Sequence, residues 1–154
     1  MIRRTFLKGT LASGGIAVAV GAGLLTPATV MAAWPKEAFE AKGVDDTLTA
    51  LLGGKDHTAS GDIKIKAPDI AENGAVVPVS ITAGQPGIES ITILAASNAT
   101  PLAASFNMGA NAEGYVSTRI KMGKTSDVVA VVKAGGKVYS ASKSVKVTIG
   151  GCGG

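Results

Sequence analysis

The sequence VVAVV at residues 128–132 is apolar at every position, and Gly135-Gly136 follows after two further residues. A short run with branched apolar side chains on both faces is typical of a strand in the middle of a covered sheet. A Gly-Gly pair accommodates the positive φ angles of a tight hairpin, so the chain is expected to return through Val138 and Tyr139. We therefore place the central strand of the protein at residues 128–132.

Shorter segments with a period of two lie on both sides of this hairpin, as expected for strands with one buried face. Their apolar positions are Ile63 and Ile65; Val77, Val79 and Ile81; Ile91 and Ile93; Val116, Ile120 and Met122; and Val145, Val147 and Ile149, with a further run from Pro101 to Phe106. Pro78 cannot donate a ladder hydrogen bond, so its strand is predicted to lie at a sheet edge or to contain a bulge. About seven short strands predict an all-β fold, an immunoglobulin-like antiparallel β-sandwich over residues 62–149, with a barrel as the alternative.

Two short helices are predicted before the sandwich, within residues 33–54. Pro35 suits the first position of one helix, and Gly43 suits its end. Asp45 or Asp46 is expected to cap the second helix. The second helix contains Leu48, Leu51 and Leu52, and Gly53-Gly54 follows it. Because the three leucines fall on one face, this helix is expected to pack on the domain or on a partner.

Residues 1–32 have the pattern of a twin-arginine export signal. Arg3 and Arg4 precede Lys8, and an uncharged run over residues 9–33 ends in Val-Met-Ala-Ala, with the small residues that a signal peptidase requires. A transmembrane anchor is the alternative, but glycines and a proline make the run only weakly hydrophobic. The sequence therefore predicts cleavage near residue 32 and a periplasmic mature protein.

Charge gives no indication of a nucleic-acid partner. The chain carries 15 basic and 11 acidic residues, and removing residues 1–32 takes away three basic residues and no acidic one. The mature chain then has 12 basic and 11 acidic residues and is nearly neutral. It has no basic stripe of the kind that neutralises phosphates.

The only cysteine, Cys152, lies between two glycine pairs at the C-terminus. The glycines are Gly150, Gly151, Gly153 and Gly154. Glycine has no preferred backbone conformation, and no bulky side chain lies within two residues of the sulfur. We therefore predict a flexible arm at residues 150–154 that is thin enough to enter a narrow channel. The alternative is a disordered terminus with an incidental cysteine.

Most uses of a thiol require partners that the sequence does not place beside Cys152. Catalysis requires a nearby base, and the single histidine, His57, lies in a polar loop, where we expect it to be solvated. A redox pair requires a second cysteine, and a structural metal site requires about four ligands. No cofactor or metal site is predicted. The remaining role is covalent carriage of a group on Cys152, while other proteins do the chemistry. An exposed thiol is also expected to form tail-to-tail disulfide dimers as a side product.

The twin-arginine leader, residues 46–54, residues 68–79 and the terminal Gly-Gly-Cys-Gly-Gly together resemble the SoxY family, the sulfur-carrier subunits of the Sox thiosulfate-oxidation system. The resemblance covers almost the whole chain, and the terminal motif is specific. It implies a non-enzymatic carrier that holds sulfur intermediates covalently on Cys152. The stretch over residues 68–79 carries over only as a structural segment.

The resemblance also implies the partners. The chain would form a heterodimer with the smaller SoxZ subunit, which would be exported with it. The c-type haem enzyme SoxAX would couple thiosulfate to Cys152, the hydrolase SoxB would release sulfate, and the sulfane dehydrogenase SoxCD could oxidise the remaining sulfur.

Two other classes compete with this interpretation. A carrier that ends in Gly-Gly and transfers sulfur as a thiocarboxylate would need cytoplasmic activation by ATP and a ubiquitin-like fold, whereas the leader predicts export. A non-catalytic immunoglobulin-like interaction module would make the tail dispensable. The two remain alternatives to the carrier at the level of the sequence.

Overall fold

Residues 35–148 are described by the computed structural model, and within them the chain forms two helices and nine strands. The helices are α2 (Lys36–Glu40) and α3 (Val44–Leu52). The strands are β1 (Thr58–Ala59), β2 (Ile63–Lys66), β3 (Ile70–Ala71), β4 (Val77–Ala83), β5 (Ile88–Ala95), β6 (Leu102–Asn107), β7 (Tyr115–Ile120), β8 (Ser126–Ala134) and β9 (Lys137–Val147). Neither helix in this part of the chain has the length and hydrophobicity needed to cross a bilayer. The predicted leader lies outside the described residues.

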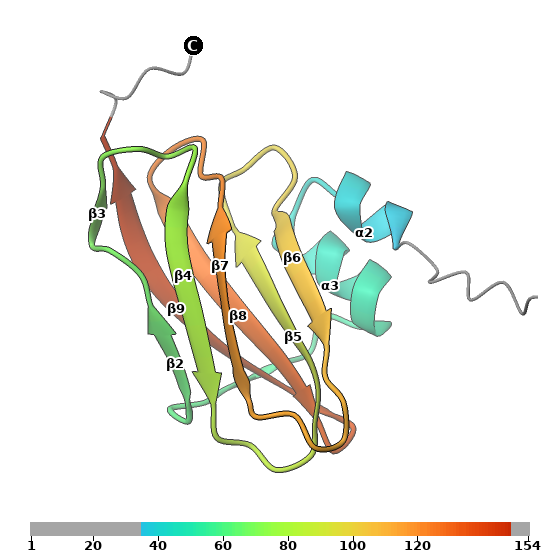
Figure 1. The fold of residues 1–154 in the computed structure, drawn as a ribbon. Coiled ribbons are helices and arrows are strands. Elements are labelled where there is room, and N and C mark those ends of the chain that lie inside the picture. The colour runs from blue at the N-terminus through green and yellow to red at the C-terminus, as the bar shows by residue number, and fades with distance from the viewer. Residues whose placement is uncertain (1–34, 149–154) are drawn as a thin grey trace, which may run out of the picture. The chain divides into compact units, whose positions relative to one another are not determined.

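The strands form two sheets that face each other (Figure 1). The larger sheet has the order β1-β9-β8-β5-β6, with β3 also paired to β9, and the smaller sheet has the order β2-β4-β7. All pairs among β2 and β4 to β9 are antiparallel. The predicted all-β sandwich is therefore confirmed, and the barrel is not.

Strand β8 is the middle of the larger sheet, as its apolar sequence predicts. One set of its side chains, Val128, Ala130 and Val132, is buried between the two sheets. The alternate residues Val129 and Val131 belong to a second apolar cluster on the opposite face. Both faces of β8 are covered, which explains why no polar residue interrupts residues 128–132.

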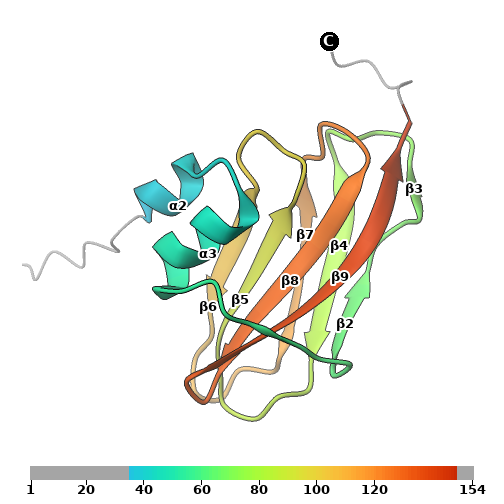
Figure 2. The same cartoon turned by 180° about the vertical axis from the view of Figure 1, so that it is seen from behind.

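The second cluster lies between the helices and the larger sheet, because the helices cover part of the outer face of that sheet (Figure 2). Leu48 of α3 is 1% exposed and belongs to one cluster with Leu94, Leu102 and Val131 from three strands. Leu51 and Leu52 pack against the same cluster. The prediction that the leucine face of the second helix packs on the domain is confirmed.

The predicted helix caps are partly wrong. Gly43 does not end the first helix but is the N-cap of α3, and no side chain caps that end. Asp45 and Asp46 lie inside the first turn of α3, where their charge still favours the positive end of the helix dipole. Pro35 is the N-cap of α2 and not its first helical residue. Only the C-terminal end of α3 is as predicted, because Gly53 adopts a left-handed conformation with φ of 79°.

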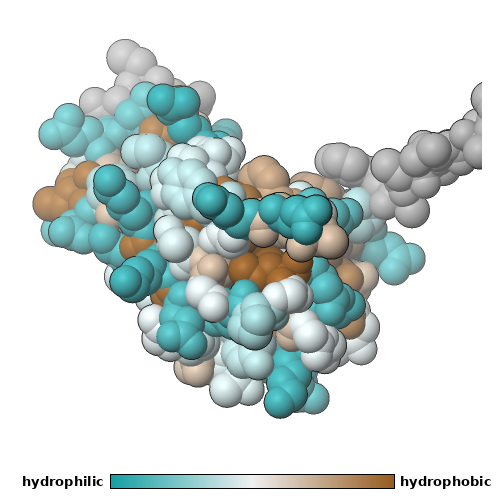
Figure 3. Space-filling model, turned by 60° about the horizontal axis from the view of Figure 1, so that its bottom comes forward, coloured by the Kyte–Doolittle hydropathy of each residue, from teal (hydrophilic) through white to brown (hydrophobic). Residues whose placement is uncertain are grey.

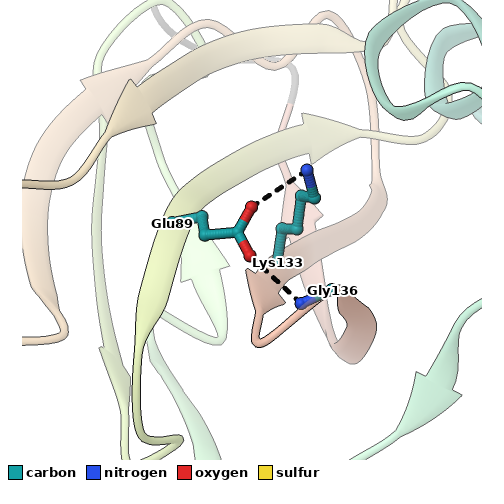
Figure 4. A network of polar contacts seen from close by, with 3 residues as sticks. All are labelled: Glu89, Lys133 and Gly136. Carbon is teal, nitrogen blue, oxygen red and sulfur yellow. Dashed lines mark hydrogen bonds and ion pairs between the residues drawn. The ribbon is translucent and has the colours of Figure 1, made fainter.

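The predicted hairpin between β8 and β9 is present, and Gly135 and Gly136 have φ of 56° and 73°. Glu89 of β5 holds this turn from the neighbouring strand (Figure 4). Its carboxylate lies 2.9 Å from the ammonium of Lys133 and accepts a 3.1 Å hydrogen bond from the Gly136 N–H. The hydrogen bond from Lys133, and to a smaller extent that from Gly136, stabilises the charged carboxylate of Glu89. Its pKa is therefore lower than the ordinary value of 4.5.

The prediction that Pro78 marks an edge strand or a bulge is wrong. Strand β4 is the middle strand of the smaller sheet, and its register with β7 has no shift. Proline is tolerated there because β2 pairs only with the C-terminal half of β4, beginning at Ser80. At Pro78 itself the one paired neighbour is Arg119 of β7, so the missing N–H interrupts no ladder on the β2 side.

Strands β1 and β3 are absent from the sequence-based prediction. Both have two residues, and both pair with β9 in parallel, β1 at Tyr139 and Ser140 and β3 at Lys146 and Val147. The larger sheet is therefore not purely antiparallel, and it begins at Thr58, before the predicted boundary at residue 62. The parallel pairing with β3 lies at the C-terminal end of β9, directly before the predicted arm.

Candidate functional site

The predicted site residues, Cys152 with Gly150, Gly151, Gly153 and Gly154, lie outside the described residues. The structure describes the part of the chain from which they leave, up to Thr148. Strand β9 ends at Val147, and Cys152 follows Thr148 by four positions in the sequence. The candidate site is therefore considered through its base, the end of β9 and the segments that contact it.

Strand β3 holds one side of this base. The Lys146 N–H donates to the Asp69 carbonyl at 2.9 Å, and the Thr148 N–H donates to the Ala71 carbonyl at 3.1 Å. These two bonds continue the backbone pairing to the last described residue. Thr148 is itself hydrogen-bonded, and in the sequence one residue, Ile149, lies between it and the first glycine of the predicted arm.

Thr125 holds the other side of the base. Its hydroxyl accepts a 3.0 Å hydrogen bond from the Val147 N–H and lies 3.4 Å from the Val147 carbonyl oxygen, to which it donates. Thr125 lies just before β8, which begins at Ser126. Its hydroxyl therefore bonds the backbone of β9 one residue beyond the end of the β8–β9 pairing. Val145, two residues upstream, is fully buried in the sandwich. The end of β9 is thus hydrogen-bonded along both edges, and the side chain of Val145 anchors it in the core of the sandwich.

Gly74 lies between the backbone at Met122 and the side chain of Val147 at the end of β9. Its carbonyl accepts a 2.7 Å hydrogen bond from the Met122 N–H. A Cβ at this position would collide with the Met122 carbonyl oxygen and would lie 2.9 Å from Cγ1 of Val147. Only glycine fits between the 122 backbone and the last strand without displacing one of them.

The same segment exposes two large apolar side chains. Ile70 is 56% exposed and Val76 is 50% exposed, and they lie at the two ends of the segment 70–76 that includes Gly74. The sequence-based prediction assigned no site to this segment. Periodicity could not identify these two residues, because Ile70 lies in a strand of two residues and Val76 lies just before the first residue of β4.

His57 lies far from the end of β9. It is exposed, and its Nδ1 lies 2.7 Å from the hydroxyl of Ser140. Ser140 precedes Thr148 by eight residues along an extended chain, a separation of about 26 Å. Among residues 35–148, no three His, Cys, Asp or Glu side chains come together in a group that could hold a metal ion. Among the described residues, the structure therefore brings neither the histidine nor a group of metal ligands to the base of the arm.

A hollow of about 430 Å³ lies on the outer face of the smaller sheet. Its lining residues are Lys66, Ala67, Pro68, Pro78, Ser80, Thr82 and Tyr115. Hydrogen bonds from the hydroxyls of Ser80 and Ser117 lower the pKa of Tyr115. The hollow is open and carries hydroxyl groups and one cation, and it belongs to a different surface from the end of β9.

Comparison with known proteins gives one family. The model of the family "Sulfur oxidation protein SoxY" matches residues 48–152, more than half of the chain. The solved structure of the sulfur carrier protein SoxY from Chlorobium limicola f thiosulfatophilum is 46% identical, covers 68% of this chain and 96% of its own, and superposes with a TM-score of 0.63. No curated protein matches the chain.

A second group of solved structures shares the fold alone. Two structures of superoxide reductase (neelaredoxin) from Ignicoccus hospitalis are 20% and 21% identical. Each covers 60% of this chain and 81% of its own, with a TM-score of 0.50. The family match and the 46% identical structure agree with each other and with the resemblance carried by the sequence motifs. The chain therefore belongs to the SoxY family of sulfur oxidation proteins.

Proposed function

We propose that this chain carries sulfur intermediates of thiosulfate oxidation as covalent adducts of Cys152 and presents them to partner enzymes. The coarser role, a sulfur carrier that is not itself an enzyme, follows from membership of the SoxY family. The observation that most supports attachment at Cys152 is the end of β9. It is fixed by Ala71 and Thr125 up to residue 148, and the only cysteine of the chain follows within four residues.

The chemistry explains why partners are required. Joining thiosulfate to the thiol forms an S–S bond, releases one proton and removes two electrons, giving Cys152–S–S–SO₃⁻. The chain has one cysteine, so no second thiol is present to take up the electrons. A haem enzyme of the SoxAX kind would accept them. Water would then cleave the bond to the terminal sulfonate in a hydrolase of the SoxB kind, leaving a persulfide on Cys152 and releasing sulfate.

The remaining parts of the proposal follow from the termini of the sequence and from the family. Residues 1–32 support export by the twin-arginine pathway and a periplasmic location. The SoxZ subunit is proposed as the heterodimer partner, and SoxCD as an enzyme that oxidises the persulfide. Residues 150–154 are proposed as the flexible arm that brings the sulfur into each partner.

Intact-mass measurement tests the proposal directly. The protein is purified from periplasm of cells oxidising thiosulfate, without reductant, beside the matched variant Cys152→Ser, which retains the shape and polarity of the arm. We expect adducts of sulfane sulfur or thiosulfonate on the wild-type protein that reductant removes, and none on the variant. An adduct-free wild-type protein from actively oxidising cells would contradict covalent carriage at this residue.

A further inference from the structure

We propose that the segment 70–76, with the exposed side chains Ile70 and Val76, is the surface on which partner enzymes dock while they act on the group held by Cys152. This inference rests on the proposed carrier function and adds to it the contact that positions the enzyme. The occupant is the rim of the channel through which the arm reaches the enzyme's reactive centre. Ile70 and Val76 would contact an apolar part of that rim, and the exposed side chains of Glu72 and Asn73 would contact polar groups beside it.

The length of the arm restricts where an enzyme can sit. Thr148 is hydrogen-bonded to the domain, and Cys152 follows four residues later. Four residues span at most about 13–14 Å when fully extended. A reactive centre buried by half of this distance leaves at most about 7 Å of chain between the two protein surfaces. The enzyme's rim must therefore lie against the residues that surround Thr148.

Segment 70–76 is the part of the fold that surrounds this point on the β3 side. The Ala71 carbonyl accepts the Thr148 N–H, and Gly74 lies against the side chain of Val147. Figure 1 shows β3 beside the C-terminal end of β9, and the chain then continues over the same end of the sandwich into β4. Any surface that covers Thr148 closely also covers residues of this segment.

The described chain exposes few large apolar side chains to a high degree. The large hydrophobic side chains with high exposure are Ile70, Val76 and Tyr115. Two of the three therefore flank the base of the arm. Apolar contacts suit a carrier that visits several enzymes, because they are non-directional and do not require each partner to place a matching charge.

Apolar exposure alone would not identify the surface, and the reach of the arm decides between the ends of the sandwich. Figure 3 brings the opposite end forward and shows apolar residues gathered there among hydrophilic ones. Tyr115 pairs with Thr82, five residues along β4 from Val77, which places it about 17 Å farther along the sandwich. An enzyme docked at that end could not receive Cys152 from an arm of this length.

The test compares the double variant Ile70→Ser/Val76→Ser with Tyr115→Ser, which removes a side chain of similar exposure outside the reach of the arm. Each full mature chain is assayed in its complex with the partner subunit, whose formation is checked by size-exclusion chromatography. The hydrolase that releases sulfate from the thiosulfonate adduct is the enzyme assayed, with KM and kcat for the loaded carrier measured separately. Reactivity of Cys152 with a small thiol reagent serves as the internal control.

We expect the double variant to raise KM about tenfold or more, with kcat changed less, since two half-exposed aliphatic side chains would no longer be buried. Tyr115→Ser is expected to leave KM within about twofold, and the thiol reagent to react equally with all proteins. The single variants Ile70→Ser and Val76→Ser should each give part of the effect.

Three results would overturn the inference. An unchanged KM in the double variant would show that the enzyme does not use this surface. Equal loss in Tyr115→Ser would remove the special role of the arm's base, and loss of the partner-subunit complex in the double variant would assign the surface to that subunit instead. Failure of the carrier function itself would be recognised separately, because the wild-type protein would then accept no thiosulfonate on Cys152 at all.

Discussion

Replacing Gly74 by alanine tests whether the base of the arm is fixed by close packing. The added Cβ would collide with the Met122 carbonyl oxygen and lie 2.9 Å from Cγ1 of Val147. Neither neighbour moves freely, because the Met122 N–H is bonded to the Gly74 carbonyl at 2.7 Å and Val147 is bonded to Thr125. Overpacking of this kind costs about 1–3 kcal/mol, which lowers the melting temperature of a domain of this size by roughly 4–12 °C.

Differential scanning calorimetry measures the melting temperature, and amide hydrogen exchange at residues 146–148 reports on the end of β9. Gly61→Ala is the matched control, since a Cβ at Gly61 meets no atom within 4 Å and its φ is not positive. This control should be neutral or slightly stabilising, by up to about 1 kcal/mol, because alanine restricts the unfolded chain. In Gly74→Ala, by contrast, the Thr148 amide should exchange faster than in the wild-type protein, since its bond to Ala71 depends on the displaced segment.

Equal melting temperatures for Gly74→Ala and Gly61→Ala would refute this account of the base. Such a result would mean that segment 70–76 moves away from β9 at no cost. The segment would then be a loosely held loop, and the end of β9 would depend on Thr125 alone.

Two further predictions concern the hairpin and the arm. Because the pKa of Glu89 is lowered in the folded protein, the stability gained from Lys133 and Gly136 is present above about pH 4.5 and is lost as the pH falls through the lowered pKa. The melting-temperature difference between the wild-type protein and Glu89→Gln should therefore be largest above about pH 4.5 and disappear once the pH has fallen below the lowered pKa. A difference independent of pH would contradict this prediction. Replacing Gly151 and Gly153 by valine should leave the thiol reactive towards small reagents but slow its turnover by partner enzymes, and equal turnover would argue against passage through a narrow channel.

The central strand was predictable because its side chains are buried among apolar groups on both faces. The run over residues 128–132 is apolar on both faces, and β8 is covered on both faces by the second sheet and by the helices. Gly135-Gly136 predicted the hairpin because few residue pairs adopt two positive φ angles in succession. The leucine face of α3 was predictable for the same reason as β8, since one burial pattern repeats over two helical turns.

The parts that were missed depend on neighbours that the local sequence does not contain. Strands β1 and β3 have two residues each and therefore no period, and only the length of β9 creates the edges on which they pair. Pro78 was assigned to an edge because the rule considers a whole strand, whereas β2 covers only part of β4. The aspartate caps failed because Gly43 occupies the N-cap of α3, and glycine has no side chain that could accept a capping hydrogen bond.

The candidate site also contains residues that the sequence predicted and residues that only the structure revealed. Cys152 and its glycines stay a prediction from the sequence, because they lie outside the described residues. Gly74 and Thr125 gave no signal in the sequence, because a lone glycine in a turn and a lone threonine before a strand are common. Their importance comes from contacts with Val147, which is more than 20 residues away from each of them.

Under the proposed carrier function, the bonds that fix the end of β9 matter as much as the glycines that follow it. A fixed base confines the sulfur within about 14 Å of Thr148, and such a short tether keeps its effective concentration near a docked enzyme on the order of millimolar or higher. If Val147 and Thr148 lost their hydrogen bonds, the tether would lengthen from four residues to six, and the volume explored by the sulfur would grow about threefold, as the cube of its reach. The docked enzyme would encounter the sulfur correspondingly less often. Anchoring by Ala71 and Thr125 therefore sets the reach of the arm, and glycine sets only its freedom within that reach.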